Sequence, residues 1–292
     1  DEKLAPDNKP NSKPYKKGAY YTGKEHAWDE AFGYFGAPAK TAQLSVDDIY
    51  NIAKRKGGAA TVKKVDLNGD GMIDLKSEMV FGPAYYAAAF DRSAIKAGRP
   101  TGYTQAIFSA YVEGRQIIAG AKGAALSAGQ ISQLKSLAAT IRTNWEKVLA
   151  EAVFKYAGSV LKDMVKIKAA LDTGNDPKKL YRAYIKHWGE LKGFSLALQS
   201  GKGDLGEVAI KLNRLVGAGP LLLNASQVVD IDRNGNYMKD QGETWAGYMV
   251  HMVKVQKLMA ENFQSRAKVN DFTGKLASLV KAAGGGSSAE ND

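Results

Sequence analysis

Residues 131–171 have the sequence ISQLKSLAATIRTNWEKVLAEAVFKYAGSVLKDMVKIKAAL, and this stretch decides the fold class. Its apolar residues recur at intervals of three or four positions from Ile131 to Leu171. Such spacing places side chains on one face of an α-helix. We therefore expect one long helix, or two helices with a kink near Gly158, that buries a continuous apolar stripe.

The same periodicity predicts helices on both sides of this stretch. Asp176 and Pro177 form a typical helix start for a segment that extends to Leu198, because a capping residue is followed by proline. The other predicted helices are Lys24–Phe35, Val46–Arg55, Ser77–Lys96, Tyr103–Lys122, Glu207–Leu215, Glu243–Gln264 and Val269–Ala282. Alternating strand patterns are nearly missing, so we predict an all-α fold of helical bundles.

The two halves of the chain repeat the same order of features. Each half has a histidine followed by acids, at His26 and His187, and then an acidic loop, at 66–71 and 230–235. The histidine precedes the loop by 40 positions in the first half and by 43 in the second. Matched order and spacing indicate a duplicated unit, and we expect two related bundles with calcium loops between helices.

Domain boundaries follow from this repeat and from the composition of the ends. We predict a first helical repeat at 20–172 and a second at 173–283, packed as one globular unit. Residues 1–19, rich in lysine and proline, and residues 284–292, rich in glycine and serine, are predicted to be flexible tethers. Because the sequence begins without methionine, we expect an exported protein, periplasmic or on the outer surface, either anchored as a lipoprotein or free.

Composition narrows the function classes. No apolar run approaches the roughly 18 residues needed to cross a bilayer, so no transmembrane segment is predicted. The chain of 292 residues has no cysteine, which excludes disulfides, thiolate zinc sites and a cysteine nucleophile. Its formal charge is +11, but the lysines are scattered and lack a recognition motif. We expect a solvated basic surface, with anionic lipid and anionic polysaccharide as the alternatives, and no nucleic-acid partner.

The segment DLNGDGMID, residues 66–74, matches the first nine positions of an EF-hand calcium loop. Oxygens at alternate residues converge on a hard cation, and Gly71 permits the turn. Position 12 is Ser77, and the acid that closes such loops follows one residue later. A plain turn is the alternative, since Asn-Gly and Asp-Gly are common turn dipeptides. The predicted ligands are Asp66, Asn68, Asp70, Met72 through its carbonyl, Asp74 and Glu78.

The segment DIDRNGN, residues 230–236, is a looser copy of this pattern. Its later acids are displaced from the EF-hand positions. The predicted ligands are Asp230, Asp232, Asn234, Asn236, Asp240 and Glu243. Calcium outside the cell would fill one or both loops and stabilise the fold.

The histidines suggest a second kind of metal site. On a helix, His26 shares a face with Asp29 or Glu30, and His187 shares one with Glu190. Imidazole and carboxylate together suit iron or zinc, and bundles build such sites from facing helices. We predict a shared site if the duplicated helices face each other. The alternative is that each histidine packs separately and bonds to a neighbour on its own helix.

Three segments together resemble the DUF4856 family of exported bacterial proteins, which is related to the imelysin-like group. They are EHAWDEAFGYFG at 25–36, GYTQAI at 102–107 and HWGELKGF at 187–194. The resemblance covers about residues 20–265. It implies two related helical bundles, a periplasmic or outer-surface location and a link to iron uptake. The group's signature is Gly-x-His-x-x-Glu. Here Gly23 precedes His26 by three positions, and an aspartate stands where glutamate is expected.

Two function classes follow. In the first, the chain is an exported, calcium-stabilised binding protein that captures a metal or metal chelate, with an outer-membrane or cell-surface partner. In the second, it is a calcium-dependent surface or assembly protein without a small ligand. A metallopeptidase ranks third, because no activated-water site can be built from this sequence, so we do not expect an enzyme. Metal analysis after calcium chelation separates the two: residual iron or zinc favours the first, and calcium alone the second.

Overall fold

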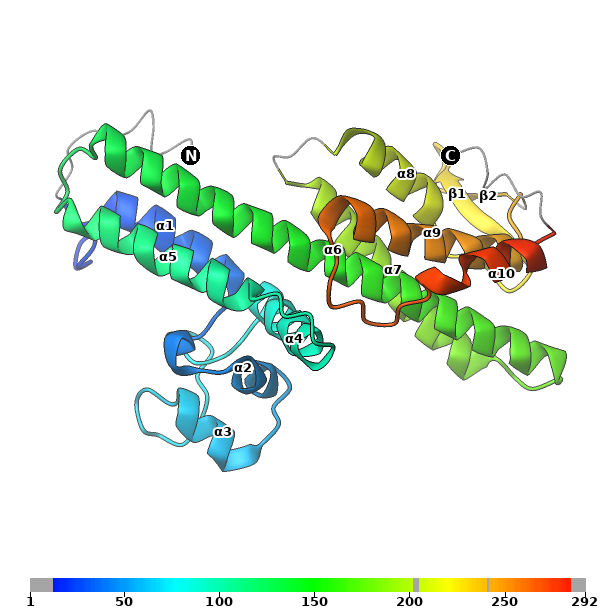
Figure 1. The fold of residues 1–292 in the computed structure, drawn as a ribbon, viewed down its shortest axis with the longest axis horizontal. Coiled ribbons are helices and arrows are strands. Elements are labelled where there is room, and N and C mark those ends of the chain that lie inside the picture. The colour runs from blue at the N-terminus through cyan, green and yellow to red at the C-terminus, as the bar shows by residue number, and fades with distance from the viewer. Residues whose placement is uncertain (1–12, 202–204, 241, 285–292) are drawn as a thin grey trace. The chain divides into compact units, whose positions relative to one another are not determined.

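The computed structural model describes residues 13–201, 205–240 and 242–284. These residues are predominantly helical, as predicted from the apolar periodicity (Figure 1). Most of each predicted tether, residues 1–12 of the first and 285–292 of the second, lies outside the described residues. No helix in the described part of the chain is long and apolar enough to cross a membrane.

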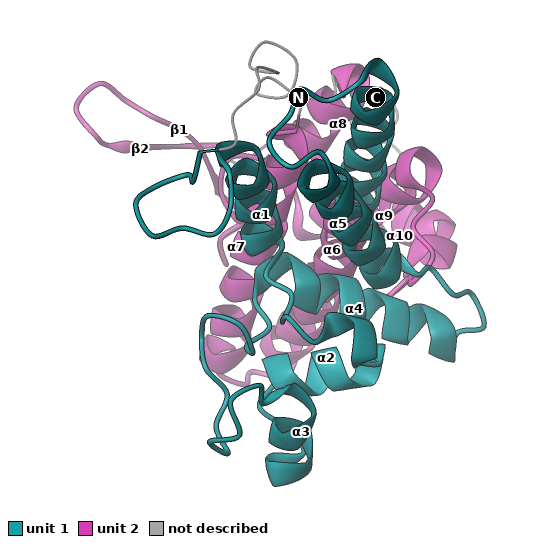
Figure 2. Ribbon diagram, turned by 90° about the vertical axis from the view of Figure 1, so that its left-hand side faces the viewer, with its two compact units in different colours: residues 1–148 teal, residues 149–292 magenta. Residues whose placement is uncertain are grey.

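The chain divides into two compact units, residues 1–148 and residues 149–292 (Figure 2). The division falls within a single helix, α6 (Ala128–Asp172). The boundary predicted between the two helical repeats, at 172 and 173, coincides with the end of this helix.

The first unit contains five helices among its described residues besides its part of α6. They are α1 (Gly23–Phe35), α2 (Val46–Ala53), α3 (Gly58–Val65), α4 (Gly82–Lys96) and α5 (Tyr103–Gly120), with a 3-10 turn, η1, at Thr41–Gln43. Helix α3 was not predicted from the sequence.

Helix α4 begins at Gly82, and not at Ser77 as the sequence predicted. The intervening backbone bonds to distant residues: Ala39 N–H donates to the Ser77 carbonyl at 2.8 Å, and Phe81 N–H donates to the Gly36 carbonyl at 2.9 Å. Residues 75–78 form a turn and Phe81 is extended, so the helix starts only after them.

Packing in the first unit centres on the contact between α1 and α5. The indole N–H of Trp28 donates to the Tyr111 carbonyl at 2.8 Å, and the Tyr111 hydroxyl donates to the Ala31 carbonyl at 3.0 Å. Gly114 lies directly beneath the indole, where a Cβ would come within 2.1 Å of the Trp28 ring. The close approach of the two helices therefore requires glycine at this position.

The second unit contains the rest of α6, three longer helices and a short C-terminal helix in its described residues. They are α7 (Lys178–Gln199), α8 (Gly206–Val216), α9 (Trp245–Phe263) and α10 (Leu276–Ala282), with a 3-10 turn, η2, at Thr273–Lys275. Two strands, β1 (Gln227–Ile231) and β2 (Tyr237–Asp240), pair in antiparallel fashion. This hairpin departs from the predicted all-α class.

Helix α6 is continuous through Gly158, without the kink that the sequence allowed. A Cβ at Gly158 would meet the Asn270 carbonyl oxygen at 2.1 Å, so this glycine lets the turn after α9 approach the helix. The buried Gln256 side chain fixes that turn, because its amide donates to the carbonyls of Phe154 and Asn270 and accepts from Phe272 N–H. The turn interrupts the helix predicted for Val269–Ala282.

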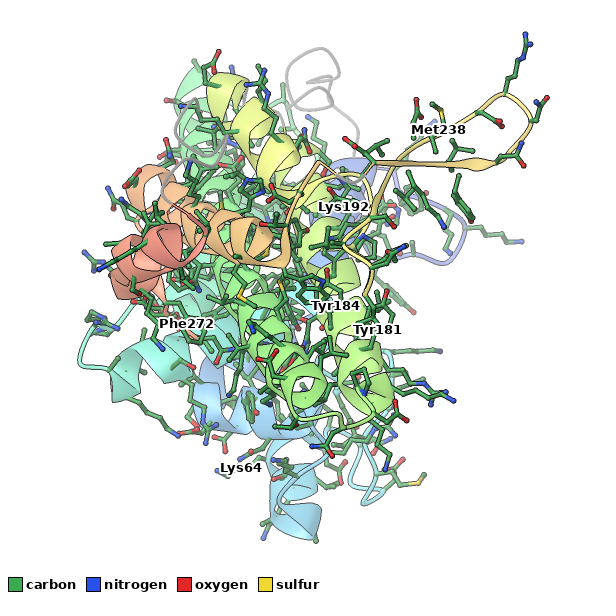
Figure 3. All side chains as sticks on the ribbon, turned by 90° about the vertical axis from the view of Figure 1, so that its right-hand side faces the viewer. Lys64, Tyr181, Tyr184, Lys192, Met238 and Phe272 are labelled. Carbon is green, nitrogen blue, oxygen red and sulfur yellow. The ribbon has the colours of Figure 1, made fainter. Side chains whose placement is uncertain are left out.

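A hydrogen-bonded chain joins α7, α8 and α9. The Trp188 indole N–H donates to the Tyr248 hydroxyl at 2.7 Å, and that hydroxyl donates to the Val216 carbonyl at 2.7 Å. The ammonium of Lys192, labelled on α7 in Figure 3, donates to the Gly217 carbonyl at 2.8 Å. A hydroxyl and a cation thus satisfy carbonyls at the C-terminal end of α8, where a positive charge is favourable.

Replacing Gly114 with alanine is expected to destabilise the first unit by about 2 kcal/mol, because the new methyl group overlaps the Trp28 ring. The control is Gly33→Ala on α1, where no atom lies within 4 Å of the added Cβ. That variant is expected to gain about 0.5–1 kcal/mol from the higher helix propensity of alanine. Urea denaturation measures both. A Gly114→Ala protein as stable as the Gly33→Ala protein would contradict the packing described.

Candidate functional site

The first acidic loop follows α3 directly and is shaped by its own carboxylates. The Asp66 carboxylate accepts from Gly69 N–H at 2.6 Å and from Gly71 N–H at 3.0 Å. Both glycines have positive φ, +77° and +76°, in the left-handed region that side chains disfavour. The chain therefore winds around the Asp66 side chain.

The other predicted side-chain ligands of this loop make the same kind of local bond. The Asn68 side-chain oxygen accepts from Asp70 N–H at 3.0 Å, and the Asp70 carboxylate accepts from Met72 N–H at 2.8 Å. The Asp74 carboxylate accepts from Ser77 N–H at 2.8 Å. Asn68 and Asp70 are exposed, and Asp66 and Asp74 are half-buried.

Glu78 is fully buried and connects two parts of the loop. Its Oε1 accepts from Leu67 N–H at 2.6 Å, and its Oε2 accepts from Asp74 N–H at 2.8 Å. The sequence predicted that this acid closes the calcium site as a ligand. In the structure its two oxygens hold backbone N–H groups at the start and the middle of the loop.

The loop's N–H donors keep two carboxylates ionised. The pKa of Asp66 is lowered mainly by its hydrogen bond from Gly71 N–H. The pKa of Asp74 is lowered mainly by its hydrogen bond from Ser77 N–H. Both pKa values lie below the usual aspartate range in the folded protein. Their stabilising contribution is therefore present above that range and is lost as the pH falls through the lowered values.

The second acidic segment has a different local structure from the first. It forms the β1–β2 hairpin, in which Asp232 holds the turn by accepting from the N–H groups of Asn234 and Asn236, each at 2.8 Å. Asp230 lies in β1 and Asp240 in β2. A simple duplication requires the two acidic segments to have the same local fold. They do not, because the first is a loop and the second is a hairpin.

Glu243, the last predicted ligand of this segment, lies beyond the hairpin and pairs with a histidine. Its Oε2 is 3.3 Å from Nε2 of His251, and its Oε1 accepts from Thr244 N–H. His251, expected from the sequence to be a packed residue, is thus placed beside a carboxylate at the start of α9.

The acids around His26 are directed toward an arginine. The Asp29 carboxylate accepts from Arg115 Nε at 2.8 Å, and Glu25 accepts from the same guanidinium at 2.7 Å. Glu30 is exposed. The His26 ring stacks on Tyr15 with ring centroids 3.7 Å apart, and on Tyr21 at 5.8 Å.

His187 bonds to an acid on another helix. Its Nδ1 is 2.5 Å from Oδ2 of Asp163 on α6. The Asp163 side chain is only 8% exposed. Glu190, one turn further along α7, has a buried oxygen, Oε2, with no hydrogen-bond partner among the described residues. Tyr156 packs against this face, its ring centroid 6.1 Å from that of His187.

Sequence reasoning missed Asp163 because 24 residues separate it from His187. One signal was available, since Asp163 falls beside apolar residues on the buried face of a predicted helix. An acid at such a position usually has a partner.

The shared histidine site stays a prediction, since His26 belongs to the first unit and His187 to the second. Within the described part of the chain, no group of three or more histidine, aspartate and glutamate side chains is arranged to hold a metal ion. This applies to the acidic loop as well as to the histidines, so the loop is a candidate cation site because of the spacing of its oxygen-bearing residues.

No family model, no curated protein and no solved structure matches this chain.

The hydrogen bond between His187 and Asp163 is expected to contribute about 1–3 kcal/mol of coupling energy in a double-mutant cycle with alanine, because the bond is short and its carboxyl group is buried. The control pair, Lys168 and Asp172 on α6, has side chains 61% and 59% exposed. Its coupling energy is expected to be about 0.3–0.5 kcal/mol. Equal coupling in the two cycles would contradict a structural role for the histidine pair.

Proposed function

We propose that this chain is an exported, calcium-stabilised helical binding protein. The observation that carries the proposal is the first acidic loop, where three oxygen-bearing side chains occupy alternate positions and a fourth follows four residues later. They are Asp66, Asn68, Asp70 and Asp74. Carboxylate and amide oxygens in this spacing are the ligands that calcium takes in EF-hand loops.

The residue types of this loop are ones that calcium takes as ligands. Each of the three aspartates keeps lone pairs beyond those used for N–H groups, because an ionised carboxylate has about four acceptor sites. Met72, at the seventh position of the loop, would add its carbonyl oxygen. Since Glu78 is occupied by two N–H groups, water would complete the shell, or Glu78 would exchange one of these bonds for the ion.

Calcium in this loop would relieve a repulsion between like charges. Asp66, Asp70 and Asp74 lie within nine residues of one loop, and all three carry negative charge at neutral pH. A cation between them offsets that repulsion only in the folded state, because the unfolded chain does not gather these oxygens. Binding therefore stabilises the fold by linkage.

The ligand proposed for this binding protein follows from the family resemblance. The resemblance to imelysin-like proteins favours a metal or metal chelate, with His26 and His187 as candidate ligands. Within each unit, however, His187 is bonded to Asp163, and Asp29 is bonded to Arg115. An iron or zinc complex would have to displace these partners. The calcium loop is independent of that question.

Removing calcium is expected to lower the melting temperature. If calcium was present at 100 times its dissociation constant, its removal costs about 2.7 kcal/mol of the free energy of unfolding. Thermal unfolding in calcium-containing buffer, with and without an excess of a calcium chelator, measures the shift. The Asp66→Asn, Asp70→Asn double variant should melt at the same temperature in both conditions, because its ligands are lost.

The matched control is Asp230→Asn, Asp232→Asn in the hairpin, which should keep the calcium-dependent shift of the unmodified protein. If chelator leaves the melting temperature of the unmodified protein unchanged, the calcium proposal is wrong. If the hairpin variant alone loses the shift, the ion binds in the second segment and not in the first.

A further inference from the structure

Helix α3 and the acidic loop form an exposed end of the first unit, residues 54–76, here called the α3 tip. In both Figure 1 and Figure 2, α3 lies beyond α2, away from the helices α4 and α5 of its own unit. Val65 is the one fully buried residue of this helix. The tip is therefore available for contact along most of its length.

Three large apolar side chains are exposed on the tip. Leu67 is 49% exposed, Met72 66% and Leu75 69%. All three lie within nine residues of one loop. A concentration of exposed apolar side chains on a short loop is a common mark of an interaction site.

The same tip is basic. Five exposed basic residues lie in α3 or just before it, and residues 49–65 contain no acid. The five are Lys54, Arg55, Lys56, Lys63 and Lys64. Lys64 pairs with Asp48 at 2.6 Å and keeps 54% of its side chain exposed. With Lys76, the tip holds six basic and three acidic residues, so its formal charge is +3. A calcium ion in the loop would raise this charge to +5, a step that rests on the proposed function.

The chemistry of the tip distinguishes between anionic partners. Single-stranded nucleic acid is bound mainly by stacking bases on aromatic rings, and residues 54–76 contain no aromatic residue. Aliphatic side chains flanked by lysines instead suit a bilayer surface, where apolar groups enter the boundary of headgroups and acyl chains while cations meet anionic headgroups.

We propose that the α3 tip docks on the surface of an anionic lipid bilayer. Leu67, Met72 and Leu75 enter the interface, and the basic residues of the tip lie against the headgroups. Calcium strengthens the contact by making the loop less negative. The helices of the unit stay outside the bilayer.

The hairpin of the second unit provides a matched comparison, since it also exposes apolar residues. Ile231 is 57% exposed, Tyr237 68%, and Met238, labelled in Figure 3, is 50%. Residues 227–240, however, contain three acids and two basic residues. An anionic surface does not attract a segment of this charge, so its apolar residues serve as the control.

The test is co-sedimentation of the full chain with vesicles of phosphatidylcholine containing 30 mol% phosphatidylglycerol, about the anionic content of a strongly charged membrane surface. Binding is expected in calcium, with much weaker binding to pure phosphatidylcholine. The triple variant Leu67→Ser, Met72→Ser, Leu75→Ser should bind at least about 30-fold more weakly, because it loses the apolar area that enters the interface. The variant Ile231→Ser, Tyr237→Ser, Met238→Ser should bind within about twofold of the unmodified protein, because its apolar side chains do not meet the bilayer.

A second pair of variants tests the charge. Lys56→Gln, Lys63→Gln should weaken binding about 25-fold, from about fivefold for each lysine near the surface. The control, Lys162→Gln, Lys166→Gln, changes two exposed lysines of α6 and should have little effect.

Equal binding of the Leu67, Met72, Leu75 variant and the unmodified protein would overturn the docking surface. So would absence of binding to anionic vesicles, or binding to a single-stranded oligonucleotide without binding to vesicles. Calorimetry measures calcium binding separately. A missing calcium site removes only the calcium dependence and the proposed function, whereas the vesicle measurements decide the docking surface.

Discussion

The buried carboxylate of Glu78 determines the shape of the acidic loop, on which the calcium site and the exposed tip both depend. An unpaired charge at zero exposure costs several kcal/mol, and here two backbone N–H groups offset that cost. Because those groups belong to Leu67 and Asp74, the loop is drawn together on its inner side. Met72 and Asp70 are exposed on this loop, whereas Asp66 and Asp74 are half-buried.

The loop is attached to a rigid helical frame. In the first unit, the Trp28 indole bonds to the Tyr111 carbonyl over Gly114, and in the second, the Trp188 indole bonds to the Tyr248 hydroxyl. In both cases a large ring packs between helices while its polar N–H is satisfied, which combines apolar burial with directional bonding. In the first unit, the short helix α3 packs against α2 and buries Val65.

The sequence predicts the long helices well because their apolar residues follow the helical period. It does not predict α3, whose sequence begins Gly58-Ala59-Ala60-Thr61 and has only a short apolar pattern. The late start of α4 was also missed, because the extended backbone at Phe81 is held by a bond to Gly36 that no local pattern reveals.

The candidate site shows the same division between local and distant information. The acidic loop was predicted from the spacing of its side chains, and the bonds of Asp66, Asn68 and Asp70 within it are local. The bond from Leu67 to Glu78, which spans 11 positions, was not predicted. The hairpin around Asp232 was not recognised, because its strands are exposed and lack the alternation that marks half-buried strands. The partners of the histidines were missed for another reason: Asp163 and Tyr15 meet them through tertiary packing.

The central claim is that the first acidic loop binds calcium through its own oxygens. Titration calorimetry of the unmodified protein and of the Asp66→Asn variant tests it most directly. The account predicts a calcium site in the unmodified protein that the substitution removes, since Asp66 supplies the first ligand of the loop. Absence of binding at millimolar calcium, or the same binding in both proteins, would contradict it.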